Sequence, residues 1–212
     1  LGVDGSEVEV RIGEETRRLR VPTAGLYSVT NALAALAAAR ALGLPDGISI
    51  AAVEGAGPAF GRQERFEADG RSVRIWLAKN PAGLNEIART LLASDGNRSL
   101  LVMLNDGIQD GQDVSWIYDA DIERLSGRVD SLVCSGDRAA DLALRFVVAG
   151  IEPDAVVSAV SDALDEALLR APPGGTLDVV ATYTAMLEVR AETARRTGAG
   201  AYWDVAPGKE AS

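Results

Sequence analysis

The chain has 212 residues, of which 47% are hydrophobic and 25% are charged, and its formal net charge is -10 at pH 7. An acidic surface of this kind repels polyanions, which argues against a nucleic-acid partner, and no run of residues stays apolar for long enough to span a membrane. Histidine is absent and Cys134 is the only cysteine, so the chain by itself cannot supply a Ser-His-Asp or Cys-His nucleophile, a disulfide or a multi-cysteine zinc site.

The first part of the chain predicts a hairpin followed by two helices. Apolar and polar side chains alternate over residues 7–22 on both sides of a glycine turn, which is typical of a half-exposed β-hairpin. Alanine and leucine dominate residues 27–44, which predicts a helix that Ser28 or Thr30 could cap. Residues 48–56 predict a second, short helix.

Glycine and proline between residues 57 and 62 favour a domain boundary, after which strands alternate with helices. Strands are expected at 72–78, 99–104, 129–134 and 177–182. Helices are expected at 83–94, 119–126, 137–149, 153–171 and 183–197, with Asp137 and Asp154 as caps or first-turn carboxylates. This alternation predicts an α/β domain with a mainly parallel sheet, in which ligands bind at the carboxyl ends of the strands.

Carboxylates gather directly after the strand expected at 99–104. They are Asp106, Asp110, Asp113, Asp119 and Asp121. The spacing is partly that of a calcium-binding EF-hand loop, but Ile108 and Ile117 stand where ligands are required, which argues against calcium. Two interpretations stay open: the aspartates form turns and cap a helix, or one or two of them face a metal, a nucleotide or a partner protein. Trp116 and Tyr118 suit either a buried edge or a protein contact.

Two cations are candidates for binding phosphate. Lys79 follows the strand expected at 72–78 and precedes a helix whose amino terminus attracts anions, and Arg62 could hold a second phosphate group. The alternative is a lysine at a strand end and an arginine in a surface ion pair. The chain contains neither a GxxxxGK[ST] loop nor a GxGxxG motif, so a nucleotide site built from this chain alone would be incomplete.

Five segments follow one another between about residues 20 and 197. They read GLYSVTNALAALAAARALG, PAFGRQERF, LAKNPAGLNE, LNDGIQDGQDVSWIYD and CSGDRAADLALR. In this order they resemble the Mur ligase family and, within it, the MurT branch. The first segment and the arginine of the second are common to Mur ligases, whereas KNPxGxNE and DGxDVSWIxD are particular to MurT.

The resemblance implies a domain organisation. Residues 1–58 would be the end of the Mur central, ATP-binding domain, residues 59–204 the MurT-type C-terminal domain with a Rossmann-like fold, and residues 205–212 a disordered tail. Because the chain begins with Leu1 rather than Met, we expect it to be a piece of a longer protein. The substrate domain, the phosphate loop and a four-cysteine zinc ribbon would precede it, and the chain alone is expected to be inactive.

The resemblance also implies an activity. MurT proteins use ATP and Mg²⁺ to phosphorylate the α-carboxylate of D-glutamate in lipid II, and ammonia from a glutaminase partner, GatD, then gives D-isoglutamine for peptidoglycan synthesis. Phosphorylation supplies the leaving group that a carboxylate lacks. The expected assembly is a heterodimer in the cytoplasm that acts on lipid II at the inner face of the membrane, and a single cysteine suits that reducing compartment.

By position, the resemblance assigns nucleotide contacts to three residues. Asn31 would contact the adenine, Arg62 would lie near the ribose and phosphates, and Lys79 would lie on the nucleotide side of the C-terminal domain. Many Mur ligases hold the ribose with an acidic residue two positions before this lysine, where this chain has Leu77.

The family further implies that an aspartate of this domain completes the Cys-His triad of the glutaminase, where it would orient the imidazole. Its position in DVSWIYD favours Asp119 as this catalytic candidate, with Asp113 as the second choice. Two other functions stay open: a docking module that only binds and activates the glutaminase, and a Mur-type ligase that adds an amino acid. The DVSWIYD segment argues against the latter.

Overall fold

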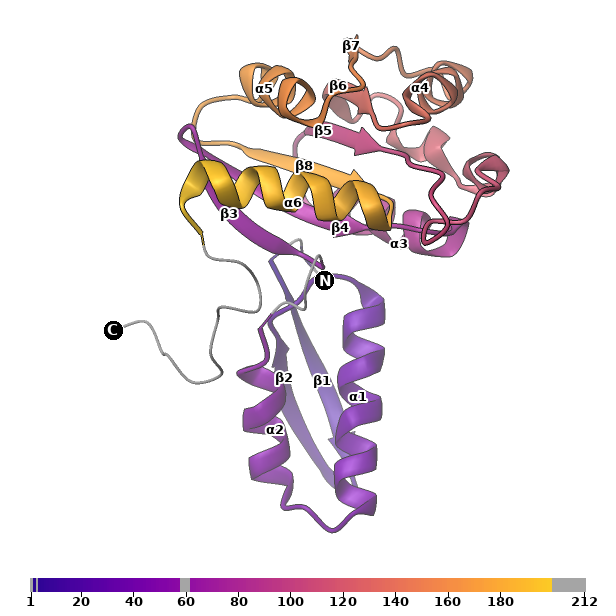
Figure 1. The fold of residues 1–212 in the computed structure, drawn as a ribbon. Coiled ribbons are helices and arrows are strands. Elements are labelled where there is room, and N and C mark those ends of the chain that lie inside the picture. The colour runs from indigo at the N-terminus through magenta and orange to yellow at the C-terminus, as the bar shows by residue number, and fades with distance from the viewer. Residues whose placement is uncertain (1, 3, 58–61, 200–212) are drawn as a thin grey trace. The chain divides into compact units, whose positions relative to one another are not determined.

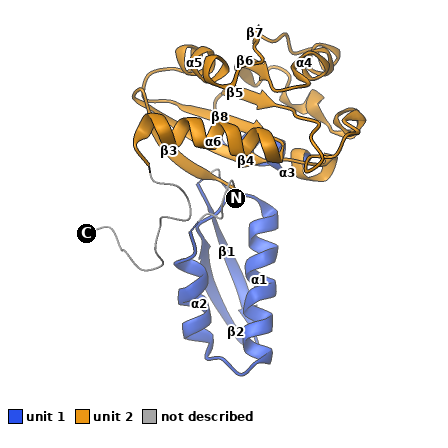
Figure 2. Ribbon diagram, viewed as in Figure 1, with its two compact units in different colours: residues 1–59, 85–95 blue, residues 60–84, 96–212 orange. Residues whose placement is uncertain are grey.

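The computed structural model describes residues 2, 4–57 and 62–199, which belong to two compact units. Unit 1 comprises residues 1–59 and 85–95, and unit 2 comprises residues 60–84 and 96–212 (Figure 2). The assignment of 1–58 and 59–204 to two Mur ligase domains stays a prediction. The tail expected at 205–212 lies outside the described residues.

Unit 1 contains the predicted hairpin and both predicted helices (Figure 1). Strands β1 (Ser6–Ile12) and β2 (Glu15–Val21) pair antiparallel, and α1 (Leu26–Ala41) and α2 (Asp46–Glu54) follow. One side of the hairpin and one side of α1 are apolar, and they pack together because neither can be left in water at low cost. The buried members of this small core are Leu19, Val21, Val29, Ala32 and Leu36.

The expected cap of α1 is wrong. The helix begins after Gly25, which has a φ of 91° and provides no side-chain cap. Ser28 and Thr30 already lie inside the helix, where their hydroxyls donate to the carbonyl oxygens of Ala24 at 2.8 Å and Tyr27 at 2.9 Å. Hydroxyls inside a helix bond to carbonyls of the preceding turn and so cannot serve the free N–H groups at its start.

Unit 2 is built on the predicted mainly parallel sheet. Its strands are β3 (Glu64–Ala68), β4 (Arg71–Leu77), β5 (Arg98–Met103), β6 (Val129–Ser135), β7 (Ala155–Val156) and β8 (Thr176–Ala181). They are arranged in the order β3-β4-β8-β5-β6-β7, and every pair except β3 with β4 is parallel. The strands expected at 72–78, 99–104, 129–134 and 177–182 are β4, β5, β6 and β8, and most of their residues are buried.

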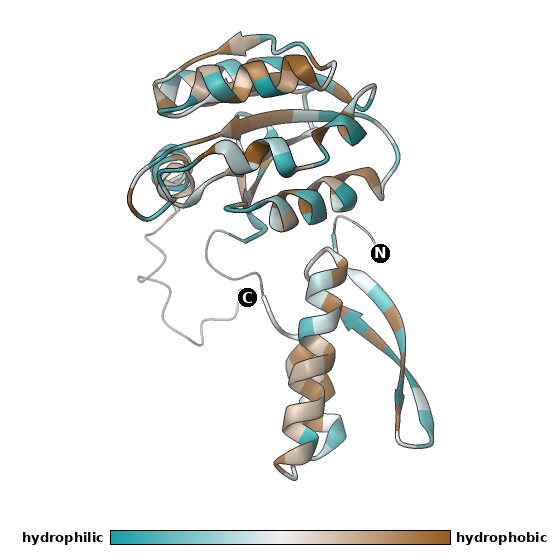
Figure 3. Cartoon of the chain, turned by 90° about the vertical axis from the view of Figure 1, so that its right-hand side faces the viewer, coloured by the Kyte–Doolittle hydropathy of each residue, from teal (hydrophilic) through white to brown (hydrophobic). Residues whose placement is uncertain are grey.

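Helices cover both faces of this sheet. They are α4 (Ala139–Val148), α5 (Val160–Arg170) and α6 (Tyr183–Thr197); α3 (Pro81–Leu92) follows β4, and its residues from Asn85 onward belong to unit 1. Apolar residues of α5 and α6 join those of β4, β5 and β8 in one large core. On the opposite face, Leu142 of α4 and Val102 of β5 line a small cavity of about 20 Å³. Figure 3 shows hydrophobic strand segments between helices that carry both hydrophobic and hydrophilic residues.

The helix expected at 119–126 is wrong in type. Two short 3-10 helices, η1 (Ser115–Asp119) and η2 (Ile122–Leu125), occupy this part of the chain. The physical reason is a tertiary contact: the carbonyl oxygen of Ala120 accepts a hydrogen bond from Arg145 at 2.7 Å. Ala120 is extended, with a φ of -91° and a ψ of 140°, so a continuous α-helix is interrupted there.

The two caps expected in unit 2 are also wrong. Asp154 was expected to start a helix at 153, but α5 begins at Val160 and Asp154 accepts the N–H of Leu132 at 2.8 Å beside the edge strand β7. Asp137 precedes α4, whose N-cap is Arg138. Strand β3 (Glu64–Ala68), the antiparallel edge of the sheet, was not predicted because it is short and three of its five residues are charged.

A buried ion pair connects β4 and β8. The Nε atom of Arg74 donates to Oδ1 of Asp178 at 2.7 Å, and both side chains are almost completely buried. The indole N–H of Trp76 donates to the same oxygen at 2.8 Å, and the Arg74 guanidinium lies 4.9 Å from the centre of the Trp76 ring. Loss of one partner would leave the other charge buried and uncompensated.

We therefore predict that Arg74→Met lowers the free energy of unfolding by about 3–5 kcal/mol, the usual effect of breaking a buried pair. Denaturant unfolding followed by tryptophan fluorescence measures this loss. The control is Arg195→Met, whose pair with Glu192 on α6 is largely exposed on the arginine side and whose loss should cost no more than about 1 kcal/mol. Equal losses in the two variants would contradict the prediction.

Candidate functional site

The carboxyl ends of β5, β6 and β8 are joined by hydrogen bonds of Asn105. Its backbone N–H donates to Oγ1 of Thr182 at 2.9 Å and its amide nitrogen donates to Oγ1 of Thr184 at 3.0 Å, both after β8. Its amide oxygen accepts the N–H of Asp137, after β6, at 3.0 Å. One buried side chain thus fixes three strand-to-helix junctions, which is where ligands of parallel α/β sheets bind.

The junction after β6 requires a glycine. Gly136 has a φ of +96°, and a Cβ atom there would lie 2.5 Å from the carbonyl oxygen of Leu104 and 2.6 Å from Oδ1 of Asn105. Both contacts are too short for a side chain. The glycine of the SGDRAAD segment therefore lets the loops after β5 and β6 approach one another closely.

Asp106, Asp110 and Asp113 have structural partners within the chain, and Asp121 also takes part in an interaction. Asp110 is buried and accepts the N–H of Thr184 at 2.8 Å, together with the hydroxyl of the same residue. Asp106 forms an ion pair of 3.0 Å with Arg138. Asp113 accepts the N–H of Ser115 at 2.9 Å; the side chain and then the backbone of Ser115 lower the pKa of Asp113 by hydrogen bonding. The interpretation as a turn former therefore holds for Asp113, whereas Asp106 and Asp110 bond to residues far along the chain.

Asp119 differs from those three. It is the last residue of η1 and is exposed, and its carboxylate makes no hydrogen bond or ion pair with the part of the chain that the structure describes. The neighbouring Tyr118 is 51% exposed. Asp119 is therefore free to contact another molecule, whereas Asp113 is already engaged by its own turn. Its catalytic role stays a prediction.

The backbone around Asp119 is held by Arg145, a residue that the sequence analysis did not single out. Arg145 lies on α4 and is 2% exposed. Its guanidinium donates to the carbonyl oxygens of Ile117 at 3.0 Å and Ala120 at 2.7 Å. The sequence offers one signal for this role, because Arg145 lies inside the apolar stretch LALRFVV. A charged residue in such a stretch is buried only where it has partners.

The three candidates for nucleotide contacts are all exposed. Lys79 follows β4, and Arg62 precedes β3. Since β3 runs antiparallel to β4 and the N–H of Gln63 donates to the carbonyl oxygen of Ile75 at 2.7 Å, Arg62 and Lys79 lie at the same end of this strand pair. Asn31 lies on α1 and belongs to unit 1.

The start of α3, beside Lys79, is already partly capped. Oδ1 of Asn80 accepts the N–H of Gly83 at 2.8 Å. One of the free N–H groups that was expected to attract an anion is therefore occupied. At this position the positive charge of Lys79 attracts a phosphate more strongly than the remaining free N–H groups of the helix do.

Other classes of site find little support. Within residues 4–57 and 62–199 no cluster of three or more acidic, histidine or cysteine side chains could hold a metal ion. Cys134 is fully buried, and burial raises the pKa of its thiol to about 12, so it is no nucleophile at neutral pH. No helix among these residues is both long and apolar enough to cross a membrane.

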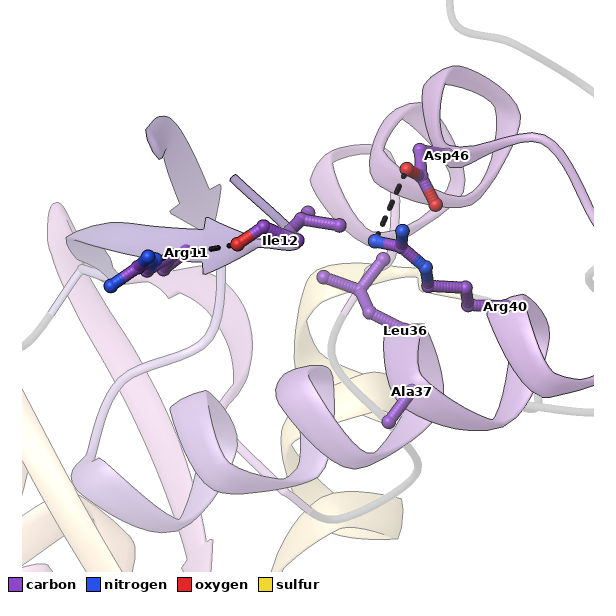
Figure 4. A pocket seen from close by; sticks show the side chains of 7 residues that line it. Arg11, Ile12, Leu36, Ala37, Arg40 and Asp46 are labelled. Carbon is purple, nitrogen blue, oxygen red and sulfur yellow. Dashed lines mark hydrogen bonds and ion pairs between the residues drawn. The ribbon is translucent and has the colours of Figure 1, made fainter. Parts of the chain in front are cut away.

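Unit 1 has an open pocket of about 290 Å³ beside the hairpin turn (Figure 4). Its two cations are engaged within the unit: Arg40 pairs with Asp46 at 3.6 Å, and Nε of Arg11 donates to the carbonyl oxygen of Gly13 at 3.3 Å. The pocket contains none of the predicted site residues, and we assign it no function.

A sequence model of the family described as MurT ligase C-terminal matches residues 77–186. The match covers more than half of the chain and includes the loop that bears Asp119. The chain belongs to the MurT family. The predicted resemblance is thereby confirmed.

Curated relatives of this MurT chain carry the same family name. It is 35% identical over 149 residues to the MurT subunit of lipid II isoglutaminyl synthase from Staphylococcus aureus strain COL, covering 70% of this chain and 34% of that protein. It is 32% identical over 197 residues to the corresponding subunit of Streptococcus pneumoniae R6, covering 92% and 41%. The chain thus spans well under half of the length of these relatives.

Solved structures confirm the predicted Mur ligase fold of this MurT chain. MurF from Acinetobacter baumannii has a TM-score of 0.69 at 22% identity, covering 90% of this chain and 44% of that one. MurC from Thermotoga maritima has a TM-score of 0.68 at 16% identity, covering 94% and 44%. At these identities the likeness establishes the fold alone.

Proposed function

We propose that this MurT chain is the C-terminal part of the ATP-using subunit of a lipid II isoglutaminyl synthase. In the proposed reaction the γ-phosphoryl group of ATP passes to the α-carboxylate of D-glutamate in lipid II, and ammonia then displaces the phosphate to give the amide. The family membership and the names of two relatives support the reaction. The exposed carboxylate of Asp119, in a chain without histidine, is the observation that carries the link to a glutaminase.

The described residues fit contacts to a nucleotide. Lys79 and Arg62 are exposed cations at one end of the β3–β4 pair, and neither is paired with a described carboxylate, so both can meet phosphate oxygens. The amide of Asn31 can both donate to and accept from a base edge. Bound Mg²⁺ would offset phosphate charge, and we assign it no ligand from these residues.

The proposed partner is a GatD-like glutaminase that supplies ammonia in a heterodimer. Its own cysteine and histidine would perform the hydrolysis of glutamine, and Asp119 would reach across the interface as the third member of the triad. There it would accept the imidazole N–H, fix the tautomer and stabilise the imidazolium. Tyr118, together with Leu144 and Val148 on one side of α4, offers exposed apolar surface for such a contact.

The proposed site of action is the inner face of the cytoplasmic membrane, where lipid II presents its stem peptide. A large lipid-linked substrate of this kind can be reached without a membrane-spanning helix in the enzyme, since its peptide lies outside the bilayer. The net charge of -10 gives no electrostatic attraction to an anionic membrane. We therefore expect the substrate peptide, rather than the membrane surface, to supply the recognition.

We predict that Asp119→Asn, in the complex with the glutaminase, lowers kcat for glutamine hydrolysis by about 10²–10⁴-fold, because an amide holds the histidine in the wrong tautomer. Asp113→Asn is the matched control, since it lies six residues earlier in the same exposed loop and its carboxylate caps Ser115. Its effect should stay within a few-fold. Wild-type hydrolysis by Asp119→Asn would refute the triad role, and a large loss in Asp113→Asn alone would transfer that role to Asp113.

We also predict that Lys79→Met, in the complete ligase, raises KM for ATP by about tenfold or more, since a charge-assisted bond to phosphate is worth roughly 1.5–3 kcal/mol. Steady-state ATP consumption with lipid II and ammonium measures it, which bypasses the glutaminase. Arg195→Met, on the exposed side of α6, is the control and should leave KM unchanged. An unchanged KM in Lys79→Met would favour the alternative of a docking module that only activates the glutaminase.

A further inference from the structure

The segment that presents Asp119 has little regular structure of its own. Between the end of β5 at Met103 and the start of β6 at Val129, the chain forms only η1 and η2, of five and four residues. Short 3-10 helices have strained hydrogen bonds and are not stable alone. The direction of the Asp119 side chain must therefore be set by contacts with the rest of unit 2.

Buried apolar side chains anchor this segment without setting its direction. Ile117, Ile122 and Leu125 are nearly fully buried and hold the segment against the sheet. Apolar contacts are non-directional, so they fix how deep the segment lies but only weakly how its peptide groups are turned. Directional contacts are needed for that.

Arg145 supplies them on both sides of Asp119. Its Nε bonds to the carbonyl oxygen of Ile117 and its Nη2 to that of Ala120, at 3.0 and 2.7 Å. Its Nη1 pairs with Glu123 at 2.8 Å, and its guanidinium lies 5.6 Å from the centre of the Tyr118 ring. One rigid, planar group thus holds the backbone just before and just after Tyr118 and Asp119.

We infer that Arg145 is a positioning residue that aims Asp119 at the partner's histidine. The inference rests on the proposed function, in which Asp119 completes the glutaminase triad. Arg145 is buried on α4 and touches neither glutamine nor the imidazole, so it acts only through the loop. Because a misplacement of about 1 Å can cost roughly 10²-fold in rate, small rotations of the Ala120 peptide would matter.

Arg145→Lys is the variant that tests this inference. Lysine keeps the positive charge beside Glu123, but a single ammonium group cannot reproduce the fork that reaches two carbonyl oxygens in different directions. Arg74→Lys is the matched control: Arg74 is also 2% exposed and paired with a carboxylate in unit 2, but it belongs to β4 and bonds to β8. Both variants are expected to lower the melting temperature.

The experiment is a double-mutant cycle in the complex with the glutaminase, with kcat and KM for glutamine hydrolysis as readouts. We expect Arg145→Lys to lower kcat by about 10–100-fold with KM within twofold, and Arg74→Lys to leave kcat within twofold. In the Asp119→Asn background, Arg145→Lys should have no further effect, because the group that it aims is already lost.

The outcomes separate this inference from the proposed function. Suppose first that Asp119→Asn lowers kcat. The positioning role is then overturned, and the triad role stands, if Arg145→Lys lowers kcat further in the Asp119→Asn background. The same conclusion follows if Arg145→Lys alone lowers kcat no more than Arg74→Lys does. If Asp119→Asn hydrolyses glutamine as the wild type does, both are overturned.

Glu123→Gln provides a second variant in case Arg145→Lys does not accumulate as a folded complex. The Glu123 side chain is 57% exposed, and hydrogen bonding to Arg145 lowers the pKa of its carboxyl group. Removing its charge should loosen the guanidinium and lower kcat by a few-fold in the wild-type background only. An equal loss in the Asp119→Asn background would overturn the positioning role.

Discussion

The carboxamide of Asn105 is the contact on which the arrangement of the site depends. It bonds to groups that follow β6 and β8, and Asn105 itself follows β5, so three loops start from fixed points at one edge of the sheet. Gly136 makes this possible, because any side chain there would collide with Asn105. The network lies at a buried position, where hydrogen bonds are electrostatically strong and their loss is costly.

From this fixed edge the acidic loop is held at successive points. Asp110 bonds to Thr184 near its start, Asp113 closes a turn on Ser115, and Arg145 holds the carbonyl oxygens on either side of Asp119. Most carboxylates of the loop therefore serve its own shape. Among its exposed carboxylates, that of Asp119 lies beside an exposed tyrosine and bonds to no described residue, in a chain with no histidine of its own. This arrangement fits a residue that serves a reaction centred on another protein.

The sequence was sufficient for β4, β5, β6 and β8 and for most helices, but not for the edge strands β3 and β7, because apolar runs such as those of β5 and β8 mark strands buried on both faces. It failed where tertiary contacts overrode local preference. Arg145, which lies 25 residues from Ala120, interrupts the helix expected at 119–126, and Asp154 bonds to β6 instead of capping α5.

The aspartates could not be ranked from sequence for the same reason. The partner of Asp110 is Thr184, 74 residues away, and that of Asp106 is Arg138, 32 residues away. Only the fold brings these groups together. The contacts assigned to Asn31, Arg62 and Lys79 came from the family resemblance; the structure places the last two at one end of the β3–β4 pair and leaves their roles as predictions.

A structure of this chain bound to its glutaminase subunit tests the central claim most directly. The distance to measure joins the carboxylate of Asp119 and the imidazole nitrogen of the partner's histidine that faces away from its cysteine. The account predicts a hydrogen bond of about 2.6–3.2 Å, with the Ile117 and Ala120 carbonyl oxygens still bonded to Arg145. The account would be contradicted if Asp119 stayed in solvent and another group accepted the hydrogen bond from that nitrogen.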